Sequence, residues 1–359
     1  MSSAHKMVIL TEGFSEPIAA KTAASVVRYR RSDVVALLDS TQAGKTAGGL
    51  IGAGDDLPVC GSLDQAPQAD TLLLGIAPPG GKIPLRWRQI ILDAIARGMD
   101  IVSGLHDFLS RDEQFVAAAR QAGVRLVDVR QNNEREVAVG QPLGDDCLRI
   151  HTVGHDCSVG KMVVSIEVAN GLRQAGADAQ FVATGQTGIM IAGEGCPIDC
   201  VVSDFVCGAA ERLILANQSH DILLIEGQGS LAHPRYSPVT LGLLHGCQPH
   251  GLILCYEVGR MEFNGLPGRR IPPLAQLRTA YEIAAQLVHP APVMGIAMNG
   301  RQIAVADAEH EKARIRDEFR LPVCDVFRDG PGELVAAVLA FRDQVRAHRR
   351  ECGDSGGKR

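Results

Sequence analysis

The segment from Gly154 to Met162 has the residue types of a phosphate-binding loop, and we interpret it as a loop of the GxxxxGK type. It follows an apolar run at 148–153 and leads into a helical pattern that begins near Lys161. Backbone N–H groups and the helix N-terminus would hold a pyrophosphate, and Lys161 would face the ligand rather than pack. The alternative is an ordinary glycine-containing connection between a strand and a helix. The residues expected to bind the cofactor here are Gly154, His155, Asp156, Cys157, Ser158, Val159, Gly160, Lys161 and Met162.

Met162 stands where nucleotide-hydrolysing loops carry Ser or Thr. That hydroxyl normally binds the Mg²⁺ that bridges the β- and γ-phosphates. Neither Met162 nor the following Val163 can ligate Mg²⁺. The sequence therefore predicts a site without a bound metal, which grips phosphates and does not necessarily cleave them.

Three further segments follow predicted strands, and ligands in open α/β sheets bind beyond the carboxyl ends of the strands. Gln186 and Thr187 are flanked by glycines, so we expect them to contact the cofactor, with a plain turn as the alternative. Glu226 occupies the position of a Walker-B-type acid, and the alternative is a capped loop.

The candidates for a catalytic acid or base are Asp204, Glu226 and His233. Histidine titrates near neutrality without perturbation, so His233 suits a general base, although a solvated loop histidine would look the same. Asp204 precedes a helical pattern and could instead be its N-cap.

Two cations are candidates for binding substrate carboxylates. Arg260 ends the segment 256–260, which follows the predicted strand 251–255, and arginine suits bidentate capture of an anion. Lys82 ends a Pro-Gly loop, 78–82, in the first half of the chain. We expect Lys82 to reach an active site between the two halves; an exposed cation without a role is the alternative.

Apolar strand patterns alternate with helical patterns, as in parallel sheets covered on both faces. We predict an α/β protein with a Rossmann-like domain at 1–140 and a P-loop NTPase-like domain at 147–346. The tail at 347–359 is predicted to be disordered. The polar stretch 131–146 separates the domains. The expected strands are 7–10, 34–38, 71–76, 101–102, 124–127, 148–153, 180–183, 221–225, 251–255, 293–297 and 322–326.

The composition of the 359 residues is that of an ordinary globular protein, with 46% hydrophobic and 21% charged residues. A net charge of -5 and 4% aromatic residues argue against nucleic acid as a partner. No run approaches eighteen apolar residues, and the N-terminus has no apolar targeting segment. We expect a cytoplasmic homo-oligomer with reduced cysteines, acting on a small molecule and not on membranes.

Four ordered motifs in the chain resemble those of the D-glutamate N-acetyltransferase (DgcN-like) family, formerly a domain family of unknown function. The resemblance covers nearly the whole chain. The second half is also similar to the P-loop proteins of the dethiobiotin synthetase and cobyrinic acid synthase group. The motifs are GHDCSVGKM at 154–162, FVATGQTGIMIAGEGCPIDCVVSDF at 181–205, IEGQGSLAHP at 225–234 and LCYEVGR at 254–260.

The resemblance implies an N-acetyltransferase that moves an acetyl group from acetyl-CoA to the amine of D-glutamate or a similar acidic amino acid. Coenzyme A has a pyrophosphate and a 3′-phosphate but no γ-phosphoryl group, which agrees with Met162. One alternative is an ATP- and Mg²⁺-dependent ligase or kinase that activates a carboxylate, with Mg²⁺ on Glu226 or Asp156. The other is a non-enzymatic nucleotide-binding regulatory protein.

Overall fold

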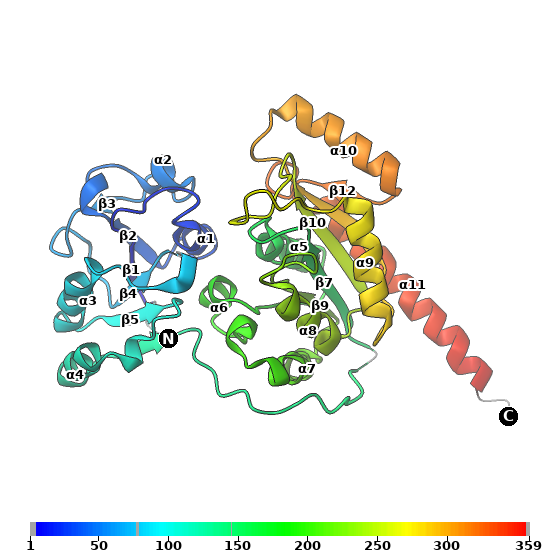
Figure 1. Cartoon of the computed structure of the whole chain (residues 1–359), viewed down its shortest axis with the longest axis horizontal. Helices are drawn as coiled ribbons and strands as arrows, with labels where there is room; N and C mark the ends of the chain where they lie inside the picture. The colour runs from blue at the N-terminus through cyan, green and yellow to red at the C-terminus, as the bar shows by residue number, and fades with distance from the viewer. Residues whose placement is uncertain (1–4, 77–78, 145, 357–359) are drawn as a thin grey trace. The chain divides into compact units, whose positions relative to one another are not determined.

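The computed structural model describes residues 5–76, 79–144 and 146–356, and side chains as far as residue 347. The chain forms two compact units, and each is described by itself. Unit 1 consists of Met1–Asn132 and Gln186–Pro197, and unit 2 of Asn133–Gly185 and Ile198–Arg359. Each unit is built on a parallel six-stranded sheet with helices packed against it (Figure 1). The predicted fold class, two parallel-sheet α/β domains, is confirmed.

Unit 1 has the strand order β3-β2-β1-β4-β5-β6. The order reverses between β1 and β4, as it does in Rossmann-like sheets. The strands are β1 Met7–Leu10, β2 Val34–Leu38, β3 Val59–Cys60, β4 Thr71–Leu74, β5 Asp100–Ser103 and β6 Leu126–Asp128. The helices are α1 Lys21–Tyr29, α2 Ala47–Ile51, α3 Trp87–Ala96, α4 Glu113–Ala122 and α6 Gln186–Ala192.

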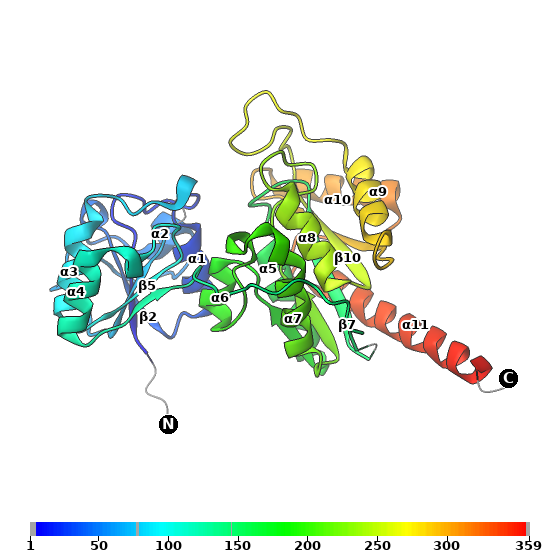
Figure 2. The same cartoon turned by 60° about the horizontal axis from the view of Figure 1, so that its bottom comes forward.

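Two apolar layers hold the helices of unit 1 against its sheet. In one layer Trp87 and Phe115, from α3 and α4, pack with Leu72 of the sheet. Figure 2 shows these two helices side by side along the sheet. In the other layer Val27 of α1 packs with Ile9. The apolar side chains alternate between the two layers along β1 and β4, so both faces of the sheet are buried.

Helix α6 belongs to unit 1, although it follows a strand of unit 2 in the chain. Met190 is buried in the α1 layer. The hydroxyls of Thr187 and Thr22 lie 3.1 Å apart, and Arg30 Nη1 donates to the carbonyl of Met190 at 3.0 Å. The sequence predicted a single division, at 140–147, whereas the chain passes between the units after Asn132, Gly185 and Pro197. The polar linker marks only the first of these three places.

Unit 2 has the strand order β12-β11-β10-β7-β9-β8. The loops after β7 and β10 flank the point where the order reverses, which is where such sheets bind ligands. The strands are β7 Leu148–Gly154, β8 Ala179–Val182, β9 Ile222–Ile225, β10 Gly251–Glu257, β11 Val293–Asn299 and β12 Val323–Cys324. The helices are α5 Lys161–Gln174, α7 Val206–Asn217, α8 Ser237–Cys247, α9 Leu274–Gln286, α10 Val305–Phe319 and α11 Gly332–Gly356.

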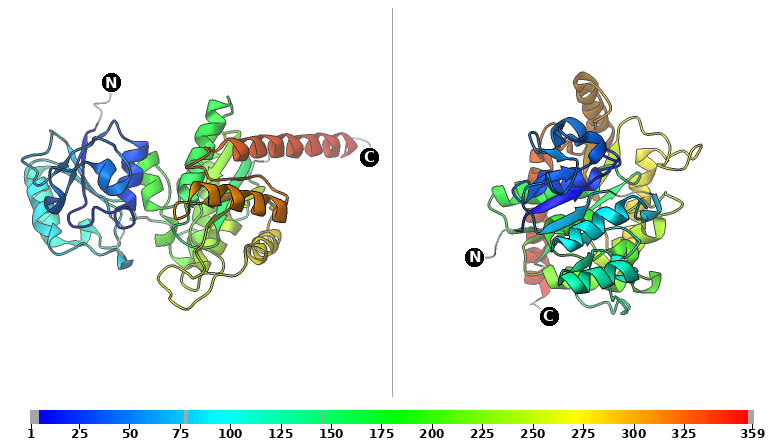
Figure 3. Two further views of the ribbon diagram at one scale, coloured as in Figure 1. Left: turned by 90° about the horizontal axis from the view of Figure 1, so that it is seen from above. Right: turned by 90° about the vertical axis from the view of Figure 1, so that its left-hand side faces the viewer.

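The long helix α11 packs on α5 and β11 with its first turns and continues beyond the sheet of unit 2 (Figure 3). It runs to Gly356, so 347–356 is helical where the sequence analysis expected disorder. Residues 357–359 lie outside the described part of the chain. Across the described residues, no helix combines the length and the apolar character that a membrane span requires.

Candidate functional site

The loop between β7 and α5 has the backbone of an anion cradle. Ser158 has φ 56° and Gly160, the N-cap of α5, has φ 110°. Left-handed residues in such a loop turn successive N–H groups toward one concavity. Five residues separate Gly154 from Gly160, one more than the GxxxxGK pattern, so the loop is a longer variant of the type expected.

Lys161 is packed into the loop and not open to solvent. Its side chain is 6% exposed, and Nζ donates to the carbonyl of Asp156 at 2.7 Å. Burial is the main cause that lowers the pKa of this ammonium group, opposed by nearby Cys157, Cys255 and Asp156. The expectation that Lys161 faces the ligand without packing is therefore wrong for this state of the loop. A bound phosphate would have to replace the carbonyl as the partner of Nζ.

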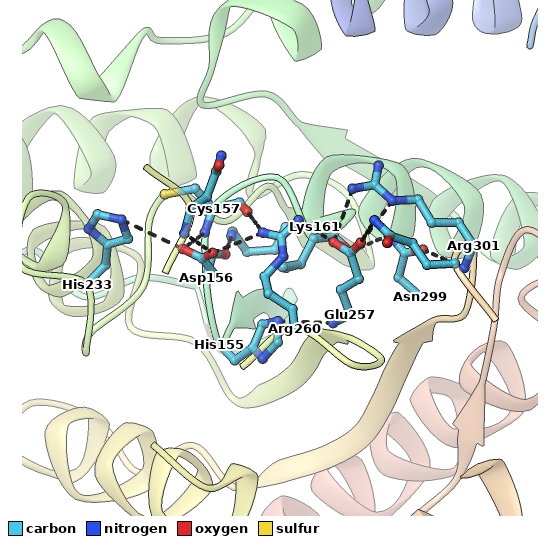
Figure 4. A network of polar contacts seen from close by, with 12 residues as sticks. His155, Asp156, Cys157, Lys161, His233, Glu257, Arg260, Asn299 and Arg301 are labelled. Atoms are coloured by element: carbon cyan, nitrogen blue, oxygen red, sulfur yellow. Dashed lines mark hydrogen bonds and ion pairs between the residues drawn. The ribbon is translucent and has the colours of Figure 1, made fainter. Parts of the chain in front are cut away.

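The carboxylate of Asp156 is fully buried and organises the loop (Figure 4). Oδ1 accepts from the amide of Cys157 at 2.7 Å. Oδ2 accepts from Arg260 Nη1 at 3.0 Å and from the amide of Asn264 at 2.8 Å. Three donors thus occupy most of the acceptor sites of this carboxylate, and Oδ1 keeps one further site.

His233 is also buried, on the loop that follows Glu226. Its Nδ1 accepts from the amide of Arg235 at 3.1 Å, so the neutral ring carries its hydrogen on Nε2. Nε2 lies 3.7 Å from Asp156 Oδ1. A ring in this tautomer has no free lone pair for a substrate proton. The solvated loop histidine considered from the sequence is wrong, and the geometry favours a positioning role.

Ligand atoms of Asp156, Cys157 and His233 lie within 4.8 Å of one another, close enough to share a metal ion. The tautomer of His233 argues against such a site, because Nε2 carries a hydrogen and offers no lone pair. Binding a cation here would require the ring to give up its bond to Arg235.

A second buried carboxylate, Glu257 at the end of β10, continues the network. Arg260 donates to it through Nη2 and at the same time to the Cys157 carbonyl through Nη1 at 2.7 Å. Arg301 donates to both oxygens of Glu257, at 3.0 and 3.1 Å, and Gln302 donates at 3.0 Å. Arg260, predicted to bind substrate, is thus fixed by two acids of the protein itself.

Asn299, the last residue of β11, ties this network to the phosphate loop. Its Nδ2 donates to the carbonyl of Val159 at 3.2 Å. Sequence analysis missed Glu257, Asn299 and Arg301 as site residues. The available signal was position, since Asn299 and Arg301 follow the predicted strand 293–297, whose end was not among the strand-end segments chosen as candidates.

Glu226 directly follows β9 and is buried. Its Oε2 accepts from the amides of Thr184 and Gly185 at 2.9 and 3.1 Å. Burial raises the pKa of the carboxyl to about 7, against the lowering effect of these two hydrogen bonds. The loop continues with Gly227, where a Cβ would lie 1.7 Å from the carbonyl oxygen of Thr152, so only glycine fits beside β7.

His155 supports the loop as a neutral acceptor. Its Nε2 accepts from the amide of Glu257 at 3.0 Å. Burial, and then the charge of Arg260, lower the pKa of His155 to about 3, so the ring is uncharged at neutral pH. The remaining loop side chains vary in burial: Val159 is buried, Cys157 and Met162 are half-buried, and Ser158 is exposed.

Four predicted site residues lie outside this network. Gln186 and Thr187 begin α6 in unit 1, and the side chain of Gln186 fills the space beside Gly104. Asp204 is exposed on the short 3-10 helix Ser203–Phe205, and the N-cap of α7 is Phe205, so Asp204 does not cap it. Lys82 is exposed in unit 1; Pro78 of its loop lies outside the described residues. Their functional roles stay predictions.

Replacing Lys161 by Met should weaken phosphate binding without unfolding the protein. We expect the affinity for inorganic pyrophosphate, measured by calorimetric titration, to fall roughly tenfold or more. The free energy of unfolding should hold or rise, because Met keeps the packing and removes a buried charge.

Lys45→Met is the matched control, because it makes the same change at another Gly-Lys pair, on an exposed side chain in unit 1. Unchanged pyrophosphate affinity in Lys161→Met, or loss of its folded structure, would contradict the assignment of Lys161.

Both units match parts of one family. Residues 136–335 match the P-loop domain of DUF1611, and residues 40–132 match its Rossmann-like domain, both described as domains of unknown function. A crystal structure of a DUF1611 family protein from Anabaena variabilis superposes with a TM-score of 0.89 at 34% identity. The match covers 94% of this chain and 99% of that one.

Two relatives are named D-glutamate N-acetyltransferase. The chain is 38% identical over 269 residues to the protein from Pseudoalteromonas sp. This alignment covers 75% of this chain and 81% of the relative. It is 39% identical over 279 residues to the protein from Tritonibacter scottomollicae, covering 77% and 83%. The family resemblance read from the four motifs is confirmed, and the chain belongs to the DUF1611 family, with its Rossmann-like and P-loop domains in that order.

Proposed function

We propose that the protein is an N-acetyltransferase that transfers the acetyl group of acetyl-CoA to the amine of D-glutamate. The names of the two relatives, at 38% and 39% identity over three quarters of the chain, support the reaction. The observation that carries the choice of acetyl-CoA is a phosphate loop with its lysine in place and Met162 next to it. Such a loop can hold the diphosphate of coenzyme A and lacks the hydroxyl that positions Mg²⁺ for phosphoryl transfer.

Glu226 is the best-placed proton acceptor in unit 2 for this reaction. With a pKa of about 7 it is partly ionised at neutral pH, as a general base should be. The amides of Thr184 and Gly185 fix Oε2, and the side chain of Gln228 also hydrogen-bonds the carboxylate, so the group is held in one orientation. Asp204 is exposed, and His233 offers no lone pair.

The chemical step then proceeds in two stages. The substrate ammonium group loses a proton to Glu226, and the amine nitrogen attacks the carbonyl carbon of the thioester. A C–N bond forms, and the tetrahedral intermediate collapses with cleavage of the C–S bond. Coenzyme A leaves as the thiolate, and the proton that the nitrogen loses as the amide forms is taken up by this thiolate. No phosphoryl group moves, so no step uses a γ-phosphate or its metal ion.

Turnover should therefore survive EDTA. We expect the protein, mixed with acetyl-CoA and D-glutamate in excess EDTA, to release coenzyme A and N-acetyl-D-glutamate at the rate seen with Mg²⁺. Thiol release and mass spectrometry of the product measure both halves of the reaction, and L-glutamate tests the stereochemistry. A requirement for Mg²⁺ together with formation of ADP or AMP would establish the ATP-dependent alternative instead.

Glu226→Gln should lower kcat roughly 100-fold or more, because the side chain keeps its shape and loses its basicity. In the wild type, kcat/KM should rise with pH through about 7, since the base must be deprotonated. The folded pKa lies above the ordinary value of 4.5, so ionisation of Glu226 destabilises the fold as pH rises from 4.5 to about 7. Glu226→Gln should remove that loss of stability.

Asp204→Asn is the comparison variant, because Asp204 was the other carboxylate considered from the sequence. Loss of turnover in Asp204→Asn, with normal turnover and an unchanged pH profile in Glu226→Gln, would transfer the role of base to Asp204.

A further inference from the structure

The network beside the phosphate loop contains more positive charge than its acids require. Glu257 is 2% exposed, and its carboxylate accepts hydrogen bonds from two guanidinium groups, those of Arg260 and Arg301. One guanidinium group suffices to neutralise one buried carboxylate. Counting Lys161 and Asp156, which belong to the same network, three cations face two carboxylates and leave one positive charge in excess.

Arg301 is the cation of this network that reaches the surface. Its side chain is 46% exposed, in contrast to 16% for Arg260. The Nε and Nη2 atoms bind Glu257, which fixes the plane of the guanidinium group. Within the described part of the chain no acceptor contacts its Nη1. The group is thus held in position with one edge available to an anion.

Asn299 places Arg301 next to the phosphate loop. The side chain of Asn299 donates to the loop carbonyl of Val159, and its Oδ1 accepts from the amide of Arg301 at 3.2 Å. Figure 4 shows Glu257 between Lys161 and Arg301, with Asn299 beside them. An anion on Arg301 would therefore be a close neighbour of a diphosphate on the loop.

We propose that Arg301 binds the 3′-phosphate of coenzyme A, which rests on the proposed function. The 3′-phosphate and the 5′-diphosphate are attached to the same ribose, so a ligand whose diphosphate lies on the loop must bring its third phosphate within one sugar of it. A phosphomonoester carries up to two negative charges, and a fixed guanidinium edge is its preferred partner. Arg301 then selects coenzyme A against nucleotides and analogues without a 3′-phosphate.

The test compares coenzyme A with 3′-dephospho-coenzyme A by calorimetric titration. We expect the wild type to bind coenzyme A roughly 10- to 100-fold more tightly than 3′-dephospho-coenzyme A, because the second ligand cannot make the charge-assisted contact. Arg301→Ala should reduce this ratio to about 1 by weakening coenzyme A alone. Arg301→Lys should give an intermediate affinity ratio, because lysine keeps the positive charge but cannot form the bidentate contact of a guanidinium group.

Gln302→Ala is the matched control, because it removes a neutral donor from the same carboxylate and leaves the charges unchanged. Its ratio should equal that of the wild type, and thermal unfolding should show that all variants are folded. Equal wild-type affinities for the two ligands, or an unchanged ratio in Arg301→Ala, would overturn the inference and leave the proposed function standing. Failure of the wild type to bind either ligand would overturn both.

Discussion

The buried carboxylate of Asp156 is the interaction on which the arrangement of the site depends. A charged group without solvent must be paired and hydrogen-bonded, and breaking such a pair costs about 3–5 kcal/mol. The loop after β10 therefore has to bring Arg260 and the amide of Asn264 to Asp156. In doing so it closes over the phosphate loop, since the same Arg260 also holds the Cys157 carbonyl. One side chain of the loop thus dictates the course of a segment 104 residues further along the chain.

Each cation around the phosphate loop has an acceptor within the protein. Lys161 binds a loop carbonyl, and Arg260 and Arg301 bind acids. A diphosphate would exchange the carbonyl partner of Lys161 for an anion, which suits an ammonium group whose pKa is lowered by burial. Glu226 lies at a different strand end, where burial raises its pKa to about 7 against the lowering effect of its bonds to Thr184 and Gly185. Phosphate binding and proton transfer are in this way assigned to separate strand ends of one sheet.

Local patterns in the sequence were enough to predict the fold and to locate the segments that follow β7 and β9. Strands such as 251–255 and 293–297 are continuous apolar runs, as expected for strands buried on both faces, and the structure contains them. The two-residue strand β3, Val59–Cys60, was missed because a run so short has no periodicity. Glu226 could be located because an acid followed by glycine ends an apolar run, although its role remains a proposal.

The rest of the site depends on contacts that no local pattern records. Asn299 lies 140 residues from its partner Val159, and only the adjacency of strands in the sheet brings them together. The tautomer of His233 depends on one backbone amide, so the sequence could not separate a base from a donor. Gln186 and Thr187 sit between glycines like ligand-binding residues, yet they begin a helix that packs on α1. The chain enters unit 1 at Gln186, so these two residues pack in unit 1, and no local pattern in the sequence predicts this.

The most direct test of the central claim, a phosphate loop that holds coenzyme A without a metal, is a pair of calorimetric titrations on the full-length protein. One adds acetyl-CoA in EDTA, and the other adds ATP in excess Mg²⁺. The account predicts saturable binding of acetyl-CoA in the absence of divalent ions, and weaker binding of ATP that Mg²⁺ does not improve. Tight, Mg²⁺-dependent binding of ATP together with no detectable binding of acetyl-CoA would contradict it.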